Sequence, residues 1–190
     1  MTELHRYEIE ILHLLVSPEH AYFGRARDGA AEVPTSDAET ARIVAGKGIV
    51  GDRFFGKAAH MDAAVTLLAV EALEAMAAEL GAPRFDPLLT RRNVVVRGAQ
   101  LAPLLGQEFA IESHGSLVWL RGGRPANPCA WMDQMLAPGA HAAMRGRGGL
   151  RCRPLSDGVV HRGPAVLLSP VMLESGRAGE STALRASRLP

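Results

Sequence analysis

Short β-strand patterns, each ended by a turn signal, most constrain the fold of this 190-residue chain. About seven such runs are interrupted by only one or two helical segments, without regular strand–helix alternation. This pattern disfavours a Rossmann or TIM-barrel architecture and favours a closed, barrel-like sheet. We therefore expect a mostly β fold in a single domain over residues 1–170. Beyond Ser169 and Pro170 the periodicity is lost, which predicts a flexible tail over residues 171–190.

The individual elements follow from periodicity and turn residues. A helix is expected over 70–80, where Gly81 and Pro83 end the pattern, and a shorter one over 138–144. Residues 64–68 fit either a strand or a helix. The predicted strands are 7–16, 39–45, 93–96, 108–111, 117–120, 150–155, 158–162 and 166–168. Two neighbouring pairs are predicted hairpins, 108–111 with 117–120, and 150–155 with 158–162 through the Ser156-Asp157-Gly158 turn.

Charge and composition exclude some classes of protein. The formal net charge is +1, which argues against a nucleic-acid binder that relies on a basic excess. Arginine carries most of the positive charge and suits planar recognition of phosphate or carboxylate, although a GC-rich genome gives the same bias. Residues 1–10 do not resemble a signal peptide, and the apolar stretches fall short of a membrane span. With two distant cysteines, we expect a cytoplasmic protein with neither nucleic-acid nor membrane partners.

Cys129, within the segment Asn-Pro-Cys-Ala-Trp-Met-Asp, is the candidate reactive thiol. Pro128 fixes a helix-entry backbone angle, and free N–H groups at a helix start favour thiolate over thiol. The alternative is that Cys129 is a small buried hydrophobe, as most cysteines are. Cys152 lies in a strand pattern between Arg151 and Arg153, so alternation places it toward the core.

A glycine-rich segment, residues 46–56, contains the second group of candidate residues. Glycines such as Gly51 let a backbone approach a ligand and present N–H groups to an anion. Asp52 can orient the guanidinium of Arg53 toward that ligand. A tight corner with a surface ion pair is the alternative reading.

Arg91, Arg92 and Asn93 precede a predicted strand, so Arg92 is expected to point away from its two neighbours. A structural asparagine is the alternative for Asn93. Residues 145–149 lack the spacing of a phosphate loop and are predicted to be a turn, with Arg145 or Arg147 as weaker phosphate candidates. The seven histidines form no close pair, which disfavours a zinc site.

The order of these motifs resembles the MOSC domain, the family named after the C-terminal domain of molybdenum cofactor sulfurases. The matching pieces are Gly-x-x-Gly-Asp-Arg, Arg92-Asn93 before a strand, Leu-x-Gly-x-x-Phe over 105–109, and Pro128-Cys129. Two positions depart from the family pattern. Phe54 stands where many members have histidine, and Ala126 stands where relatives often carry a second cysteine, which leaves Cys129 as the single candidate thiol.

The resemblance implies a closed β-barrel with helical crossovers that binds a molybdenum–pterin cofactor. It implies Cys129 as the metal ligand or sulfur carrier, and it makes Gly51, Asp52, Arg53, Arg92 and Asn93 the cofactor-binding candidates. Two activities fit, reduction of N-hydroxylated small molecules and sulfur transfer, and these would need an electron donor protein or a sulfur donor protein, respectively. The alternative is a non-catalytic carrier in which Cys129 only anchors the cofactor.

Overall fold

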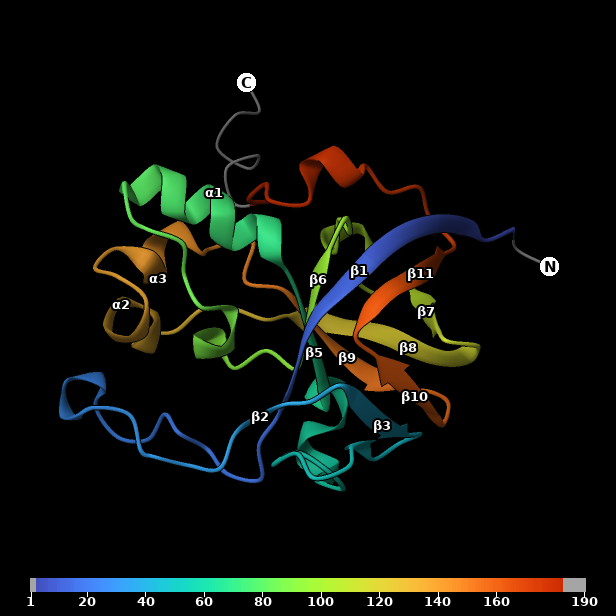
Figure 1. Ribbon diagram of the computed structural model, residues 1–190, viewed down its shortest axis with the longest axis horizontal. Coiled ribbons are helices and arrows are strands. Elements are labelled where there is room, and N and C mark those ends of the chain that lie inside the picture. The colour runs from blue at the N-terminus through green and yellow to red at the C-terminus, as the bar shows by residue number, and fades with distance from the viewer. Residues whose placement is uncertain (1–2, 183–190) are drawn as a thin grey trace.

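The computed structural model describes residues 3–182 (Figure 1). Its strands are β1 (His5–Val16), β2 (Ser36–Asp37), β3 (Thr40–Val44), β4 (Gly48–Ile49), β5 (Val65–Ala69), β6 (Val94–Arg97), β7 (Glu108–Ser113), β8 (Ser116–Pro125), β9 (Leu150–Pro154), β10 (Gly158–His161) and β11 (Gly163–Ser169). The α-helices are α1 (Val70–Leu80), α2 (Trp131–Met135) and α3 (Ala140–Ala143). Short 3-10 helices are η1 (Ala26–Asp28), η2 (Ala58–Ala63), η3 (Pro87–Thr90), η4 (Ala102–Leu104) and η5 (Ser175–Arg177).

Seven strands of the described chain close into a barrel in the order β11–β7–β8–β9–β5–β6–β1, and β1 returns to β11. The long first strand makes the closure. Its first half pairs with β11, from His5 opposite Ser169 to Ile11 opposite Gly163. A register shift follows Ile11, and the second half of β1 continues along β6. The expected mostly β, closed barrel is thus confirmed.

Helix α1 connects β5 to β6, the parallel pair in the barrel. Parallel neighbours need a crossover, and α1 provides it by burying one face. Leu73, Met76 and Ala77 lie on that face, at helical spacing. The helix ends at Gly81, whose φ of 60° is the left-handed conformation of a C-terminal cap. Both predicted bounds of this helix are confirmed, and the ambiguous residues before it form β5.

Two apolar clusters hold the molecule together. The first fills the barrel and includes Ile11, Leu67, Phe109 and Leu120. The second lies outside the barrel, where α1, α2 and α3 gather on one side (Figure 1). Because Trp131 in α2 belongs to this second cluster, the segment just before it, which contains Cys129, is held against the outer face of the barrel.

The two predicted hairpins have different outcomes. Strands β7 and β8 form the first, with Ser113 opposite Ser116 at the turn. The second was predicted wrongly, because β9 pairs with β5 and β8, whereas β10 pairs with β3 in a small separate sheet with β4. The turn residues bond to other elements instead: Ser156 Oγ accepts from the Trp119 amide at 2.8 Å and Asp157 Oδ1 accepts from the Ala45 amide at 2.7 Å.

The segment after β11 packs back onto the barrel over residues 171–182 (Figure 1). Leu173 is buried, and its amide donates to the Tyr7 hydroxyl at 2.7 Å. Further along, the Thr182 amide donates to Gly146 O at 3.1 Å. These contacts differ from the flexible tail that the sequence predicts, because single anchoring side chains leave no periodic pattern. Residues 183–190 of the predicted tail lie outside the described residues.

Candidate functional site

Cys129 lies in a short connection between β8 and α2, residues 126–130, here named the thiol loop. The residue is exposed, and the Met132 amide donates to its backbone carbonyl at 2.9 Å, which fixes the entry into α2. Cys152 lies in a different environment. It is fully buried in the barrel core, as its alternation with Arg151 and Arg153 predicts, and burial raises the pKa of its thiol.

A cavity of about 170 Å³ opens beside Cys129, here named the Cys129 cavity. It brings together the loop after β1, the glycine-rich turn with η2, strand β5, residues 90–92 before β6, strand β9, the thiol loop and α2. Its lining residues are His20, Ala21, Tyr22, Arg53, Phe54, His60, Ala63, Thr66, Thr90, Arg91, Arg92, Cys129, Met132 and Arg151. Three of the candidates from the sequence, Arg53, Arg92 and Cys129, therefore line one cavity although they are distant in the chain.

Asp52 and Asn93 lie behind the cavity wall and bond to each other. Asn93 Nδ2 donates to Asp52 Oδ2 at 3.0 Å, and the Asp52 side chain is fully buried. The remaining groups of Asn93 are used as well, since its Oδ1 accepts from the amide and the hydroxyl of Thr66 at 3.0 and 2.8 Å. Gly51 supplies the left-handed turn before this pair, with φ of 84°. These three residues shape the corner from which Arg53 projects.

Arg53 reaches the cavity with part of its hydrogen-bonding capacity unused. Its side chain is only 8% exposed, and Nη1 and Nη2 donate to Asp52 Oδ2 at 3.4 Å and to Arg91 O at 3.3 Å. The guanidinium also lies 4.8 Å from the Phe54 ring centroid. Its Nε is buried without a partner among the described residues. Burial lowers the pKa of Arg53, and the Asp52 carboxylate opposes that change.

Arg92 ties the thiol loop to the barrel. Its Nη2 donates to Ala126 O at 3.0 Å, and its Nε donates to Gly148 O at 3.0 Å. A third bond runs from Nη1 to Thr90 O at 3.1 Å. Burial lowers the pKa of Arg92 to about 10, which leaves it charged at neutral pH. The charged guanidinium therefore holds the segment that contains Cys129 in place through hydrogen bonds.

Arg91 also lines the cavity, contrary to the alternation expected for a strand. Its φ is 57°, the left-handed conformation that ends η3, so strand geometry begins only after it. Its Nη2 donates to Ser17 Oγ at 2.8 Å and to Glu19 O at 2.9 Å, which attaches the loop after β1. Arg91 and Arg92 consequently both contribute positive charge to one cavity.

Arg151 completes the set of four arginines, and sequence spacing gave no signal for it. Burial lowers the pKa values of Arg92 and Arg151, whereas the negative charge of a Cys129 thiolate raises them. Both arginines line the same cavity as the sulfur of Cys129. The cavity is therefore suited to a thiolate and to an anionic ligand at the same time.

An aromatic rim surrounds the mouth of the cavity, and no sequence motif indicated it. His20 makes edge contacts with Phe23 and Phe54, and Phe54 in turn lies 5.0 Å from the His60 ring. Burial, followed by the charges of nearby arginines, lowers the pKa of His20. The position that departs from the family pattern, Phe54, is thus packed between two imidazoles at the cavity mouth.

Tyr22 is a further aromatic residue that lines the cavity. It stacks on Trp131 at 5.0 Å between ring centroids, and its hydroxyl donates to the Leu89 carbonyl. Burial raises the pKa of Tyr22 to about 12, so the phenol stays neutral at physiological pH. The stack connects the cavity to the cluster under α1, which fixes the position of α2.

Other candidates from the sequence lie elsewhere. Neither Arg145 nor Arg147 lines the Cys129 cavity, and Arg147 forms an ion pair with Glu79. Within residues 3–182, no three His, Cys, Asp or Glu side chains form a group able to hold a metal ion. In that same range, no helix has the length and apolar character needed to cross a membrane.

Comparison with known proteins gives the family and the fold. The model of the MOSC domain matches residues 46–167. The YuaD protein from Bacillus subtilis superposes with a TM-score of 0.66 at 18% identity, covering 89% of this chain and 100% of that one. YiiM from Geobacillus stearothermophilus and YiiM from Escherichia coli each give a TM-score of 0.56 at 16% identity over 92% of this chain, and over 80% and 76% of theirs. Comparison with curated protein sequences gives no match.

Proposed function

Because this chain belongs to the MOSC domain family, we propose that it binds a molybdenum–pterin cofactor at the Cys129 cavity, with Cys129 as metal ligand or sulfur carrier. One observation carries the proposal: an exposed thiol shares a cavity with four arginines, one of which has a buried Nε without a partner among the described residues. An unpartnered buried donor is costly unless a ligand completes its hydrogen bonding.

The donor set of the cavity fits such a cofactor better than a bare metal ion. Thiolate sulfur suits a soft metal, yet among the described residues that line the cavity Cys129 is the only thiol, and no cluster of further His, Cys, Asp or Glu ligands accompanies it. A metal held here would need additional ligands, which a metal-binding organic cofactor carries with it. The arginines, in turn, match the charge of a phosphate group.

The size of the cavity indicates how much of the cofactor it would enclose. Its volume of about 170 Å³ is below the roughly 300–1,000 Å³ typical of a pocket for a whole small-molecule ligand. We infer that the cavity encloses one end of the cofactor. The aromatic rim of His20, Phe54 and His60 would then border the remainder.

Some of the proposed cofactor-binding residues would touch the cofactor, and others would hold those residues in position. Arg53 would contact the phosphate, because its Nε is the donor not used within the described chain. Gly51, Asp52 and Asn93 would act by holding Arg53 in place, since their own groups are used in the corner behind it. Arg92 would hold the thiol loop and add charge.

Two reactions are consistent with the thiol. When bound, molybdenum would supply two-electron redox chemistry beside Cys129. In reduction of an N-hydroxylated small molecule, Cys129 would remain a metal ligand, and an electron donor protein would be the partner. In sulfur transfer, the Cys129 thiolate would attack the outer sulfur of a persulfide on the sulfur donor protein. The new S–S bond would leave a persulfide on Cys129, and the broken S–S bond would release the donor's cysteine as a thiolate. In both cases the four arginines would stabilise negative charge at the sulfur and at the bound phosphate.

Metal and pterin analysis tests the proposal. The full chain and Cys129→Ser, produced in a molybdenum-sufficient host, would be compared by elemental analysis and by pterin fluorescence after oxidation. We expect both molybdenum and pterin in the unaltered chain. We expect Cys129→Ser to retain pterin and to lack the reductase or sulfur-transfer activity. Cys152→Val, at a buried apolar position, is the matched control and should keep both. Bound cofactor without turnover would indicate a carrier, and a chain that takes up neither component on reconstitution would contradict the proposal.

A further inference from the structure

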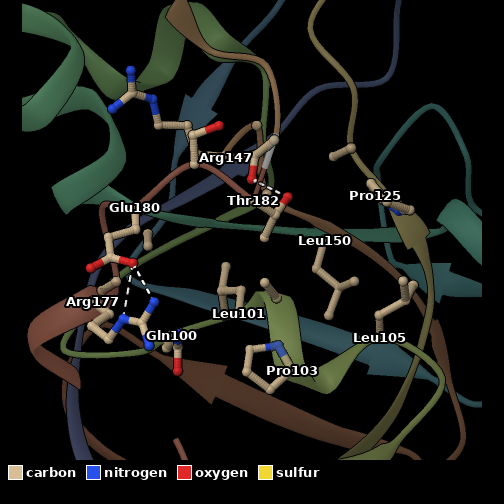
Figure 2. A pocket seen from close by; sticks show the side chains of 18 of the residues that line it. Gln100, Leu101, Pro103, Leu105, Pro125, Arg147, Leu150, Arg177, Glu180 and Thr182 are labelled. Carbon is tan, nitrogen blue, oxygen red and sulfur yellow. Dashed lines mark hydrogen bonds and ion pairs between the residues drawn. The ribbon is translucent and has the colours of Figure 1, made fainter. Parts of the chain in front are cut away.

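A second cavity, of about 310 Å³, lies between η4, the 146–150 turn and the C-terminal segment that contains η5 (Figure 2). One wall is aliphatic. Its side chains are Ala69, Leu101, Ala102, Pro103, Leu105, Pro125, Ala126 and Leu150. Leu105 is 45% exposed, so part of its side chain is accessible to a ligand. This wall can bury the apolar body of a ligand.

The opposite wall carries charge, and every charged side chain on it is paired. Arg147 forms an ion pair with Glu79. Arg177 bonds to Glu174 at 3.1 Å and to Glu180 at 2.6 Å, as Figure 2 shows for the second contact. A charged ligand would have to break one of these pairs or remain without a counterion in a partly desolvated site. The cavity therefore favours a neutral molecule.

Neutral hydrogen-bonding groups are present on the polar wall as well. Gln100 Oε1 accepts from the Glu174 amide at 2.9 Å, which leaves its side-chain NH₂ as a donor. The Thr182 hydroxyl donates to Gly146 O at 3.0 Å, which leaves its oxygen lone pairs as acceptors. Either group can bond to a neutral polar group of a ligand.

The second cavity is separate from the Cys129 cavity. The two share no lining residue. Arg92 stands between them, since it lines the Cys129 cavity and bonds to the carbonyls of Ala126 and Gly148, which line the second. The two sites also differ in chemistry, because the Cys129 cavity holds four arginines and the second holds only paired charges.

We propose that the second cavity is a ligand site for a neutral organic molecule with an apolar body and a neutral hydrogen-bonding group, such as an amide. Burial of the apolar body against Leu101, Leu105 and Leu150 provides the affinity. Gln100 or Thr182 orients the ligand by bonding to its polar group. The site uses none of the residues that line the Cys129 cavity, so it stands whether or not a cofactor binds there.

Three nearly isosteric probes test the class of ligand: benzamide, benzoate and benzamidine, which are neutral, anionic and cationic. Each would be titrated into the full chain while the leucine methyl signals are followed by NMR. We expect benzamide to shift the methyl signals of Leu101, Leu105 and Leu150, and to bind at least about tenfold more tightly than either charged probe. Benzoate or benzamidine binding there as tightly as benzamide would overturn the proposal.

Substitutions at exposed positions locate the binding. Ala102→Trp adds an indole at the cavity wall and should abolish the benzamide shifts, and Leu105→Ser, which removes apolar contact, should weaken them. Ala142→Trp, at an exposed position on α3 outside the cavity, should leave them unchanged. Persistence of the same shifts in both Ala102→Trp and Leu105→Ser would place the benzamide elsewhere and contradict the proposal.

Discussion

The two thiols of the chain differ in access and in surroundings. Cys129 is exposed beside cationic side chains, whereas Cys152 is fully buried and burial raises the pKa of its thiol. We predict that a brief exposure of the native protein to iodoacetamide alkylates Cys129 first, because the thiolate is the reactive form. Peptide mass spectrometry at successive times measures the order. Equal labelling of Cys152 in protein that is still folded would contradict it.

Arg53 is the residue on which anion binding should depend most. Lysine at this position keeps the charge and lacks the Nε donor, so Arg53→Lys should weaken oxyanion binding by about 1.5–3 kcal/mol, the range for one hydrogen bond to a charged group. Calorimetric titration with molybdate measures the change. Arg42→Lys, at an exposed position on β3, is the matched control and should bind like the unaltered chain. Unchanged affinity in Arg53→Lys would remove Arg53 from the anion site.

At the scale of elements, the thiol loop depends on one side chain for its attachment to the barrel. Arg92 bonds to four carbonyls, those of Thr90, Ala126, Asn127 and Gly148, and one lysine ammonium cannot reproduce that planar geometry. We predict that Arg92→Lys lowers the free energy of unfolding by about 1.5–3 kcal/mol for each charged bond not replaced. It should also change the alkylation rate of Cys129, since the loop is no longer fixed.

Urea denaturation measures the first effect of Arg92→Lys, and the alkylation assay measures the second. Arg124→Lys is the appropriate control, because Arg124 lies at an exposed position near the end of the same strand that leads into the thiol loop. Equal stability of the two variants would show that the carbonyl contacts of Arg92 do not hold the loop.

For the molecule as a whole, the barrel and its appended segments should open at different rates. Strand β5 is buried and bonded on both sides, to β6 and β9. The segment after β1, residues 17–35, holds only η1 and is largely exposed. We predict slow amide hydrogen exchange in the barrel strands, β1 and β11 included, and fast exchange over residues 17–35. Mass spectrometry measures the exchange. If the amides of β1 exchanged as fast as those of residues 17–35, the barrel would open between β1 and β11.

Part of the candidate site could be predicted from the sequence, because the order of the motifs indicates which residues belong to one site. Arg53, Arg92 and Cys129 line one cavity, and Asp52 and Asn93 bond to each other behind it. Arg91 was placed incorrectly, because its left-handed backbone cannot be read from residue types. The histidines and aromatic residues of the rim have no spacing signal at all, since they come from segments that meet only in the folded chain.

The sequence by itself determined the elements whose causes are local. Periodicity and Gly81 defined α1, and alternation around a short turn defined the hairpin of β7 and β8. Only the tertiary structure decided which strands pair across the barrel, as the separation of β9 from β10 shows. It also decided which cavities form and which charges are neutralised in them. Patterns in a sequence report backbone geometry within a few residues, whereas pairing and cavity shape depend on packing between residues far apart in the chain.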